Sequence, residues 1–343
     1  MFIFVVQLKK MQKIVLWVLA FMLISCGSIN KEGSEKESIS QKYASEIQPE
    51  DLKEHLFLLS SDILEGRKTG EKRQKMAVNY FTAYYEHIGL LAPELYPDYT
   101  QTIPKEYFEG KSEAASKNVL AYIEGSEFPN EVVVISAHYD HLGMKGEEVY
   151  NGADDNASGS SAVMELAQSF QMAKRKGNAP KRSILFLHLT GEEIGLFGSQ
   201  FYLENPVFSL ENTVVDLNID MVGRVDQKHM DKKEYIYLIG SNRLSKELHD
   251  ISQQSNKKYT HLKLDYTYND EDDPNNFYER SDHYNFAKNN IPVIFYFNGN
   301  HSDYHRTTDT ADKIDFELLA LRTRLIFHTA WEIANRDERI LVD

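Results

Sequence analysis

Apolar residues occur in short continuous runs along most of the chain, and polar segments separate these runs. Runs of this kind indicate strands that are buried on both faces of a sheet. They predict strands over residues 131–138, 182–190, 212–220, 234–240 and 291–299. Elsewhere the apolar residues follow a helical spacing, which predicts helices that include residues 158–177 and 315–336.

The alternation of strands and helices predicts an α/β fold. We expect a mostly parallel, mixed central sheet with helices on both faces. Parallel strands bring their carboxyl ends to the same edge of a sheet, and ligands bind at that edge in folds of this class. The residues that follow each predicted strand are therefore the first candidates for a functional site.

The N-terminal residues follow a different pattern. Lys9, Lys10 and Lys13 precede an apolar run over 14–24, and the single cysteine of the chain, Cys26, follows two residues after the run. A basic segment, a short apolar segment and a junction of small residues are the parts of an export signal, and the run is shorter than the ~18 residues of a membrane span. The stretch "LISC" (23–26) resembles the lipobox of bacterial lipoproteins, in which the cysteine is lipidated.

We therefore divide the chain into three segments. Residues 1–25 are a lipoprotein signal peptide, residues 26–44 are a flexible polar tether, and residues 45–343 are one catalytic domain. The protein is then exported and anchored to a membrane through Cys26, in the periplasm or at the outer-membrane surface of a bacterium. The alternative is an ordinary signal peptide with a chance cysteine.

Composition and charge exclude one class of partner. The 343 residues carry a net charge of −14, and a nucleic-acid partner requires a basic surface. A hydrophobic content of 42% is enough for a core of ordinary size. We expect no nucleic-acid partner.

Carboxylates and imidazoles follow four of the predicted strands. They are His138, Asp140, His141, Asp154, Asp155, Glu192, Glu193, Asp220, His301, Asp303 and His305. Any one of them is commonly structural, but so many at one edge of a sheet indicate a cation. Carboxylate and imidazole ligands without a thiolate suit zinc, and less often manganese or cobalt.

The motifs around these residues resemble those of the family 28 metallopeptidases, which are co-catalytic di-zinc exopeptidases. The motifs are "HYDHLG", "NGADDNASG", "TGEEIGLFGSQ", "NIDMVGR", "ERSDHYNF" and "YHRTTDT", in that order. The resemblance begins at about residue 46 and extends to the end of the chain. It implies the zinc-exopeptidase fold, which is phosphorylase/hydrolase-like, and two Zn²⁺ ions per chain.

The resemblance also implies a role for each site residue. His138 and Asp220 would bind one zinc, Glu193 and His305 the other, and Asp155 both. Glu192 would be the general base rather than a ligand. Asp140 would hydrogen-bond the second nitrogen of His138 and fix its tautomer, and the peptide bond after Asp155 would be cis.

Other side chains have weaker assignments. Tyr278 and Tyr304 are two candidates to stabilise the oxyanion, and Arg280 is a candidate to meet a substrate carboxylate. His301 competes with His305 for the last ligand position. His141, His188 and His283 are not assigned as ligands, and the apolar surroundings of His188 indicate a core residue.

Three functions fit the motifs. The first is a zinc aminopeptidase that removes N-terminal residues from peptides through a metal-activated water, with dipeptidase and carboxypeptidase as variants. The second is a glutaminyl-peptide cyclase of the same fold. The third is a non-enzymatic surface-binding lipoprotein. We favour the aminopeptidase because both sets of ligands are complete.

Overall fold

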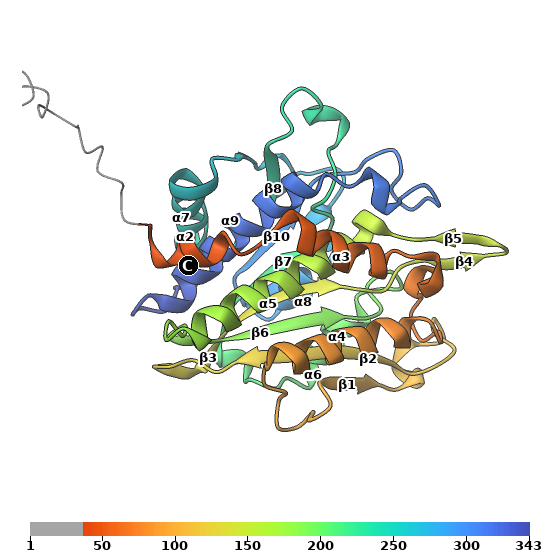
Figure 1. Cartoon of the computed structure of the whole chain (residues 1–343), viewed down its shortest axis with the longest axis horizontal. Helices are drawn as coiled ribbons and strands as arrows, with labels where there is room; N and C mark the ends of the chain where they lie inside the picture. The colour runs from red at the N-terminus through yellow and green to blue at the C-terminus, as the bar shows by residue number, and fades with distance from the viewer. Residues whose placement is uncertain (1–36) are drawn as a thin grey trace, which may run out of the picture. The chain divides into compact units, whose positions relative to one another are not determined.

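The centre of the molecule is a mixed sheet with helices on both faces (Figure 1). The computed structural model describes residues 37–343, and Ile39–Asp343 form one compact unit. The eight strands follow the order β1-β2-β6-β3-β7-β10-β8-β9. Their bounds are Thr100–Ile103 (β1), Ser116–Ile123 (β2), Phe128–His138 (β3), Arg182–Leu189 (β6), Thr213–Ile219 (β7), Tyr235–Ile239 (β8), Lys263–Asp265 (β9) and Val293–Phe297 (β10). A separate hairpin pairs β4 (Gly143–Lys145) with β5 (Glu148–Tyr150).

The four central strands β6, β3, β7 and β10 are parallel to one another. Strands β2 and β8 join this core antiparallel, on opposite sides. After β3 the chain passes to β6 on one side, and it later returns to β7 on the other side. The strand order therefore reverses at β3, and this reversal opens a crevice at the carboxyl ends of the strands. The predicted fold class is confirmed.

Eight α-helices lie within residues 37–343. They are α2 (Ile39–Ala44), α3 (Pro49–Leu59), α4 (Gln74–Ile88), α5 (Gly159–Arg175), α6 (Phe197–Glu204), α7 (Lys246–Ser255), α8 (His283–Lys288) and α9 (Phe316–Asn335). Helices α3, α5 and α9 pack together over the face that is nearer to the viewer in Figure 1, and α8 packs on β7 and β10.

Strand β3 shows why the central strands have continuous apolar sequences. Val133 and Ile135 belong to the apolar core that contains residues of α3, α5 and α9. Val132 and Val134 face the opposite way, into the core that contains Tyr202 of α6 and residues of α8. Because both faces are covered, both sets of alternating side chains are apolar.

The compact unit begins earlier than we predicted. Residues 39–44, assigned to the tether, form α2, in which Tyr43 and Ala44 are buried. The ring of Tyr43 stacks 6.0 Å from that of Trp331 on α9, and this apolar contact holds the segment on the domain. The export signal and Cys26 lie outside the described residues. Between residues 37 and 343, no helix combines the length and the apolar character of a membrane span.

Candidate metal centre

The predicted ligands come from the carboxyl ends of neighbouring strands. His138 is the last residue of β3, and Asp220 directly follows β7. Glu193 follows β6, Asp155 lies in the irregular turn before α5, and His305 follows β10. The peptide bond between Asp155 and Asn156 is cis, as the resemblance implied. The order of the parallel strands therefore brings together residues that are up to 167 positions apart in the chain.

One group of ligand atoms surrounds His138. Its Nε2 atom lies 3.3 Å from Asp155 Oδ1 and 3.3 Å from Asp220 Oδ1. All three side chains are buried or nearly so. His138 Nε2 and Asp220 Oδ1 have no hydrogen-bond partner within the described part of the chain. Buried polar atoms without partners are rare, so this group needs an ion to satisfy it.

A second group surrounds Glu193. His305 Nε2 lies 3.0 Å from Asp155 Oδ2 and 3.3 Å from Glu193 Oε2. His141 also reaches this group, with Nδ1 2.7 Å from Glu193 Oε1. The sequence analysis did not assign His141 as a ligand, and the only signal for it was its place as the second histidine of "HYDHLG". Asp155 has one oxygen in each group, so it is placed to bridge them.

The spacing of these atoms fits a metal of the zinc type. When metal–ligand bonds are ~2.0–2.1 Å long, two ligands of a tetrahedral site are about 3.3 Å apart. The distances from His138 and His305 to their carboxylate neighbours are 3.0–3.3 Å. Carboxylate oxygen and imidazole nitrogen are both zinc ligands. The site is therefore built to hold metal, and Asp155 would be shared between its two halves.

The electrostatics of the site also call for positive charge. Burial raises the pKa of the Glu192 carboxyl well above its usual value, and the carboxylates of Glu193 and Asp220 add to this rise. Burial would also raise the pKa of Asp155, but neighbouring imidazoles outweigh it and hold this pKa well below its usual range. A cluster of buried carboxylates is costly unless cations compensate it.

Hydrogen bonds hold the tautomer of His138. Its Nδ1 lies 3.2 Å from the backbone carbonyl oxygen of Asp140, which can only accept. Nδ1 therefore carries the hydrogen, and the lone pair of Nε2 faces the carboxylates. Asp140 is the residue that we predicted for this role, and it fills the role through its backbone carbonyl. The carboxylate of Asp140 is turned to other donors: Oδ2 accepts from Thr69 Oγ1, and Oδ1, which is 3.8 Å from His138 Nδ1, accepts from the backbone N–H of Glu192.

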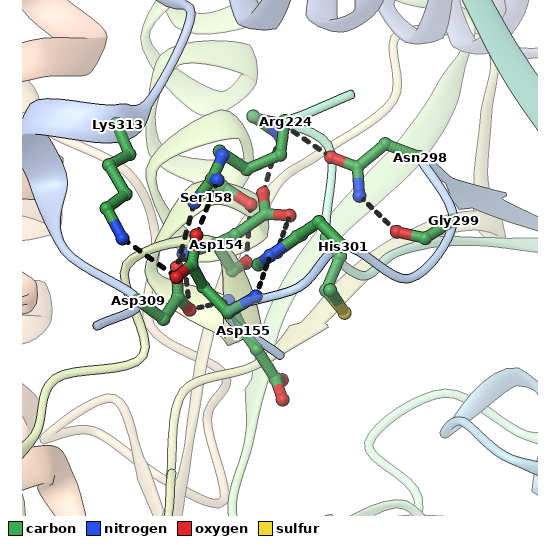
Figure 2. Close-up of polar contacts among 12 residues, drawn as sticks. Asp154, Asp155, Ser158, Arg224, Asn298, Gly299, His301, Asp309 and Lys313 are labelled. Carbon is green, nitrogen blue, oxygen red and sulfur yellow. Dashed lines mark hydrogen bonds and ion pairs between the residues drawn. The ribbon is translucent and has the colours of Figure 1, made fainter. Parts of the chain in front are cut away.

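Asp154 points away from the two groups. Its carboxylate accepts from the backbone N–H of Gly223 at 2.7 Å and lies 3.1 Å from His301 Nε2. Asp309 accepts from the backbone N–H groups of Asp154 and Asp155 and so holds this turn in place. In Figure 2 the carboxylate of Asp155 extends out of this network. His301 is thus occupied by Asp154, and His305 is the histidine that reaches the ligand groups.

Two further residues that the sequence analysis did not assign support the site. Ser281 donates to Asp220 Oδ2 at 2.7 Å, which orients the other oxygen towards His138. Arg67 is buried and donates to the carbonyls of Tyr139, Asn151 and Gly152, which ties the loop after β3 to the turn before α5. Both residues act on ligand-bearing segments from distant parts of the chain. Ser281 lies in the motif "ERSDHYNF", but the motif alone does not reveal which side chain it contacts.

A small pocket opens beside the ligand groups. It is lined by Asp155, Glu192, Asp220, Met221, Phe277, Arg280, Phe295, Phe297, Asn300 and Tyr304. Tyr304 and Arg280 therefore lie beside the ligand groups. Tyr278 is not among the lining residues; its ring contacts the guanidinium of Arg243 at 4.3 Å and the ring of His283 at 5.7 Å.

Two other histidines are core residues. His188 is buried, its Nε2 lies 2.6 Å from the hydroxyl of Tyr85, and its ring stacks on Phe81 at 3.9 Å. His283 is buried and stacks on Phe295 at 4.7 Å. Neither ring belongs to the ligand groups, in agreement with the sequence analysis.

Known proteins share this chain's motifs and its fold. The model of Peptidase family M28 matches residues 118–330. A "Probable zinc metalloprotease" of Pyrenophora teres f. teres is 39% identical over 112 residues, which are 31% of this chain and 22% of that protein. A "Probable leucine aminopeptidase" of Arthroderma otae is 29% identical over 63% of this chain and 57% of that protein. The chain thus matches less than two thirds of the length of each of these relatives.

Solved structures agree on the fold. LapB from Legionella pneumophila has a TM-score of 0.68 and 21% identity, over 88% of this chain and 76% of that one. The aminopeptidase from Aneurinibacillus sp. strain AM-1 has a TM-score of 0.65 and 16% identity, over 89% and 98%. The family model covers more than half of the sequence, and it includes strands β3 to β10 and all five predicted metal ligands. This chain therefore belongs to Peptidase family M28.

Proposed function

We propose that this protein is a zinc-dependent aminopeptidase that removes N-terminal residues from peptides and holds two zinc ions. The observation that carries the proposal is the pair of ligand groups that share Asp155. His138 and Asp220 complete one group, and Glu193 and His305 complete the other. A single-zinc cyclase would have no use for a complete second group.

Glu192 is the residue placed to move a proton. It follows β6 and is next to Glu193 in the sequence, but unlike Glu193 it lines the pocket. When bound, zinc supplies Lewis-acid polarisation of the scissile carbonyl and a water of lowered pKa. The Glu192 carboxylate takes a proton from the attacking water and returns it to the leaving amine nitrogen.

The pocket suits a free N-terminus. Glu192 is the lining carboxylate that binds no zinc, so it is the one that can face the ammonium group, and the aromatic rings of Phe277 and Phe297 form an apolar wall. Tyr304 stacks on His305 at 3.9 Å and lines the same pocket, so its hydroxyl is the candidate to stabilise the oxyanion. Names of relatives, such as "Probable leucine aminopeptidase", agree with this reading of the geometry.

The test is hydrolysis of a panel of aminoacyl-nitroanilides and of peptides with free or acetylated N-termini, with zinc present. We expect release of single amino acids from free N-termini and none from acetylated peptides. Cleavage of acetylated peptides from the other end would indicate a carboxypeptidase. Loss of ammonia from N-terminal glutamine without peptide cleavage would indicate the cyclase.

We also propose that the protein is an exported lipoprotein that is anchored through Cys26. The support is the sequence "LISC" after a basic and apolar leader. Cys26→Ser should abolish lipidation and release the protein from the membrane fraction. A variant that is processed normally and stays with the membrane would contradict the proposal.

A further inference from the structure

His141 occupies a position that no hydrogen bond explains. It lies three residues after His138, and its side chain is fully buried. A side-chain carbon at Gly152 would come within 2.5 Å of its ring, so the ring is held tightly on that side. The ring meets that of His305 edge to face, with 5.7 Å between centroids. The imidazole is therefore fixed in place next to the Glu193 ligand group.

The atoms of His141 that face this group have no ordinary partner. Nδ1 lies 2.7 Å from Glu193 Oε1 and 3.7 Å from Asp155 Oδ2. Yet His141 Nδ1 and Glu193 Oε1 both lack a hydrogen bond of normal geometry to any described residue. The two atoms are close, but no hydrogen is directed from one to the other. Lone pairs that converge on a third point give this arrangement, which is the arrangement of two ligands around one ion.

The distances support the same conclusion. His141 Nδ1 lies 2.7 Å and 3.7 Å from its two carboxylate neighbours. The distance of about 3.3 Å that is expected between two ligands of a tetrahedral zinc falls between these values. His141, Asp155 and Glu193 place one ligand atom each within 4.8 Å of one another, as His138, Asp155 and Asp220 do. The Glu193 group is thus built like the His138 group. Each contains an imidazole from the end of β3 or from the residues just after it.

We propose that His141 is an additional metal ligand, so that the Glu193 metal has four protein ligands and the His138 metal has three. The four are His141, Glu193, His305 and the shared Asp155. This inference rests on the proposed two-zinc function. Four protein ligands are typical of sites that hold zinc permanently, whereas three leave a position open for water or substrate.

The proposal makes the two metals unequal. Three of the four ligands of the Glu193 metal are buried, and only His305 is partly exposed, with 37% of its side chain accessible. Dialysis against a chelator should therefore remove the His138 metal first. A single zinc should remain bound at the Glu193 side until stronger chelation removes it.

X-ray absorption spectroscopy of the zinc-loaded wild-type protein tests the ligand count directly. The expected result is three imidazole ligands for each pair of zinc ions, from His138, His141 and His305. Two imidazoles for each pair would overturn the inference and leave the two-zinc function intact. A wild-type protein that binds no zinc would overturn both.

Zinc titration of the apo-protein by calorimetry supplies the variant test. His141→Phe keeps a ring but removes the donor, and it should weaken the tighter zinc by more than the 10–100-fold typical of residues that only orient a ligand. His283→Phe is the matched control, because His283 is equally buried and also lacks a hydrogen-bond partner among the described side chains. It should bind both zinc ions as the wild type does.

If His141→Phe does not fold, as judged by circular dichroism of the apo-protein, His141→Ala replaces it. Unchanged zinc affinities in a folded variant would overturn the inference. The wild-type spectrum decides the question even if both variants fail to fold.

Discussion

Two clusters in this molecule contain the same residue types but differ in what they are built to do. In the metal centre, buried histidines lie between carboxylates, and several of the facing atoms have no hydrogen-bond partner in the described structure. In the second cluster, His229 lies between Asp226 and Asp265, with its two ring nitrogens 2.8 Å and 3.1 Å from their oxygens.

The second cluster is closed by its own neighbours. Tyr237 donates to Asp226 at 2.7 Å, and Lys228 donates to Asp265 at 3.0 Å. The ring of His229 also stacks on Tyr235 at 3.6 Å. Each nitrogen of His229 points to a different carboxylate on an opposite side of the ring. The nitrogens and oxygens of this cluster therefore do not converge on a point where an ion could bind.

The comparison shows that composition does not distinguish a metal site from a structural cluster. The distinction lies in where the lone pairs point. In the metal centre the nitrogens and oxygens converge on shared points, whereas around His229 they pair with one another. A buried carboxylate is satisfied by an ion in the first case and by hydrogen bonds in the second.

The largest expected effect is at Glu192, which belongs to the metal centre but is not a ligand. Glu192→Gln keeps the shape of the side chain and removes its ability to take a proton. It should lower kcat by ~10²–10⁴-fold with zinc content unchanged. Glu193→Gln is the matched control and should lower zinc content. Metal analysis and steady-state kinetics of both variants measure this, and loss of zinc from Glu192→Gln instead would reverse the two roles.

The next effect separates the clusters by stability. His229→Phe keeps the stacking on Tyr235 but leaves two buried carboxylates without their shared partner. It should lower the free energy of unfolding by about 3–5 kcal/mol, as measured by urea denaturation. Zinc content should stay at the wild-type value. A variant of normal stability that has lost zinc would show that the second cluster serves the metal centre.

Removal of zinc should lower the stability of the protein only when the metal centre is able to bind zinc. Zinc that binds the folded state alone, at a free concentration one hundred times its dissociation constant, stabilises a site by about 2.7 kcal/mol. Removal with EDTA should therefore lower the melting temperature, and added zinc should restore it. The increment should be the same in His229→Phe and smaller in His138→Ala, which loses only the zinc of the His138 group. Equal increments in the two variants would contradict the assignment of His138.

The last effect is absent at neutral pH and concerns His188, an imidazole that is buried with no carboxylate in contact with it among residues 37–343. Burial lowers its pKa to about 3. In the unfolded chain the pKa is about 6.5, so below this pH the unfolded state takes up a proton that the folded state does not. Stability should therefore fall as the pH drops from about 6.5 towards 3, by about 1.4 kcal/mol per pH unit for this group.

His188→Phe tests this effect, because it removes the titrating group and keeps the stacking on Phe81. The slope of unfolding free energy against pH, between pH 4 and pH 6, should become shallower by that amount. The absolute stability of the variant also changes, since Tyr85 loses its partner. An unchanged slope would mean that His188 is protonated in the folded state.

Much of the architecture was predictable because it depends on local patterns. The central strands β3, β6, β7 and β10 are covered on both faces, and this produces the continuous apolar runs that identify them. Strands β1 and β2 and helices α3 and α4 were not assigned. Of these, β1 is an edge strand of only four residues, which is too short to show a recognisable apolar run.

The sequence by itself determined which residues stand at the carboxyl ends of the strands, and so which side chains meet at the site. It did not determine the direction of their atoms. Only the tertiary structure decided that His141 faces Glu193 while His301 is taken by Asp154. It also decided that the carbonyl of Asp140, rather than its carboxylate, faces His138. The physical reason is that each ring nitrogen or carboxylate oxygen pairs with the group that lies nearest to it in the folded chain. These groups come from segments that are distant in the sequence.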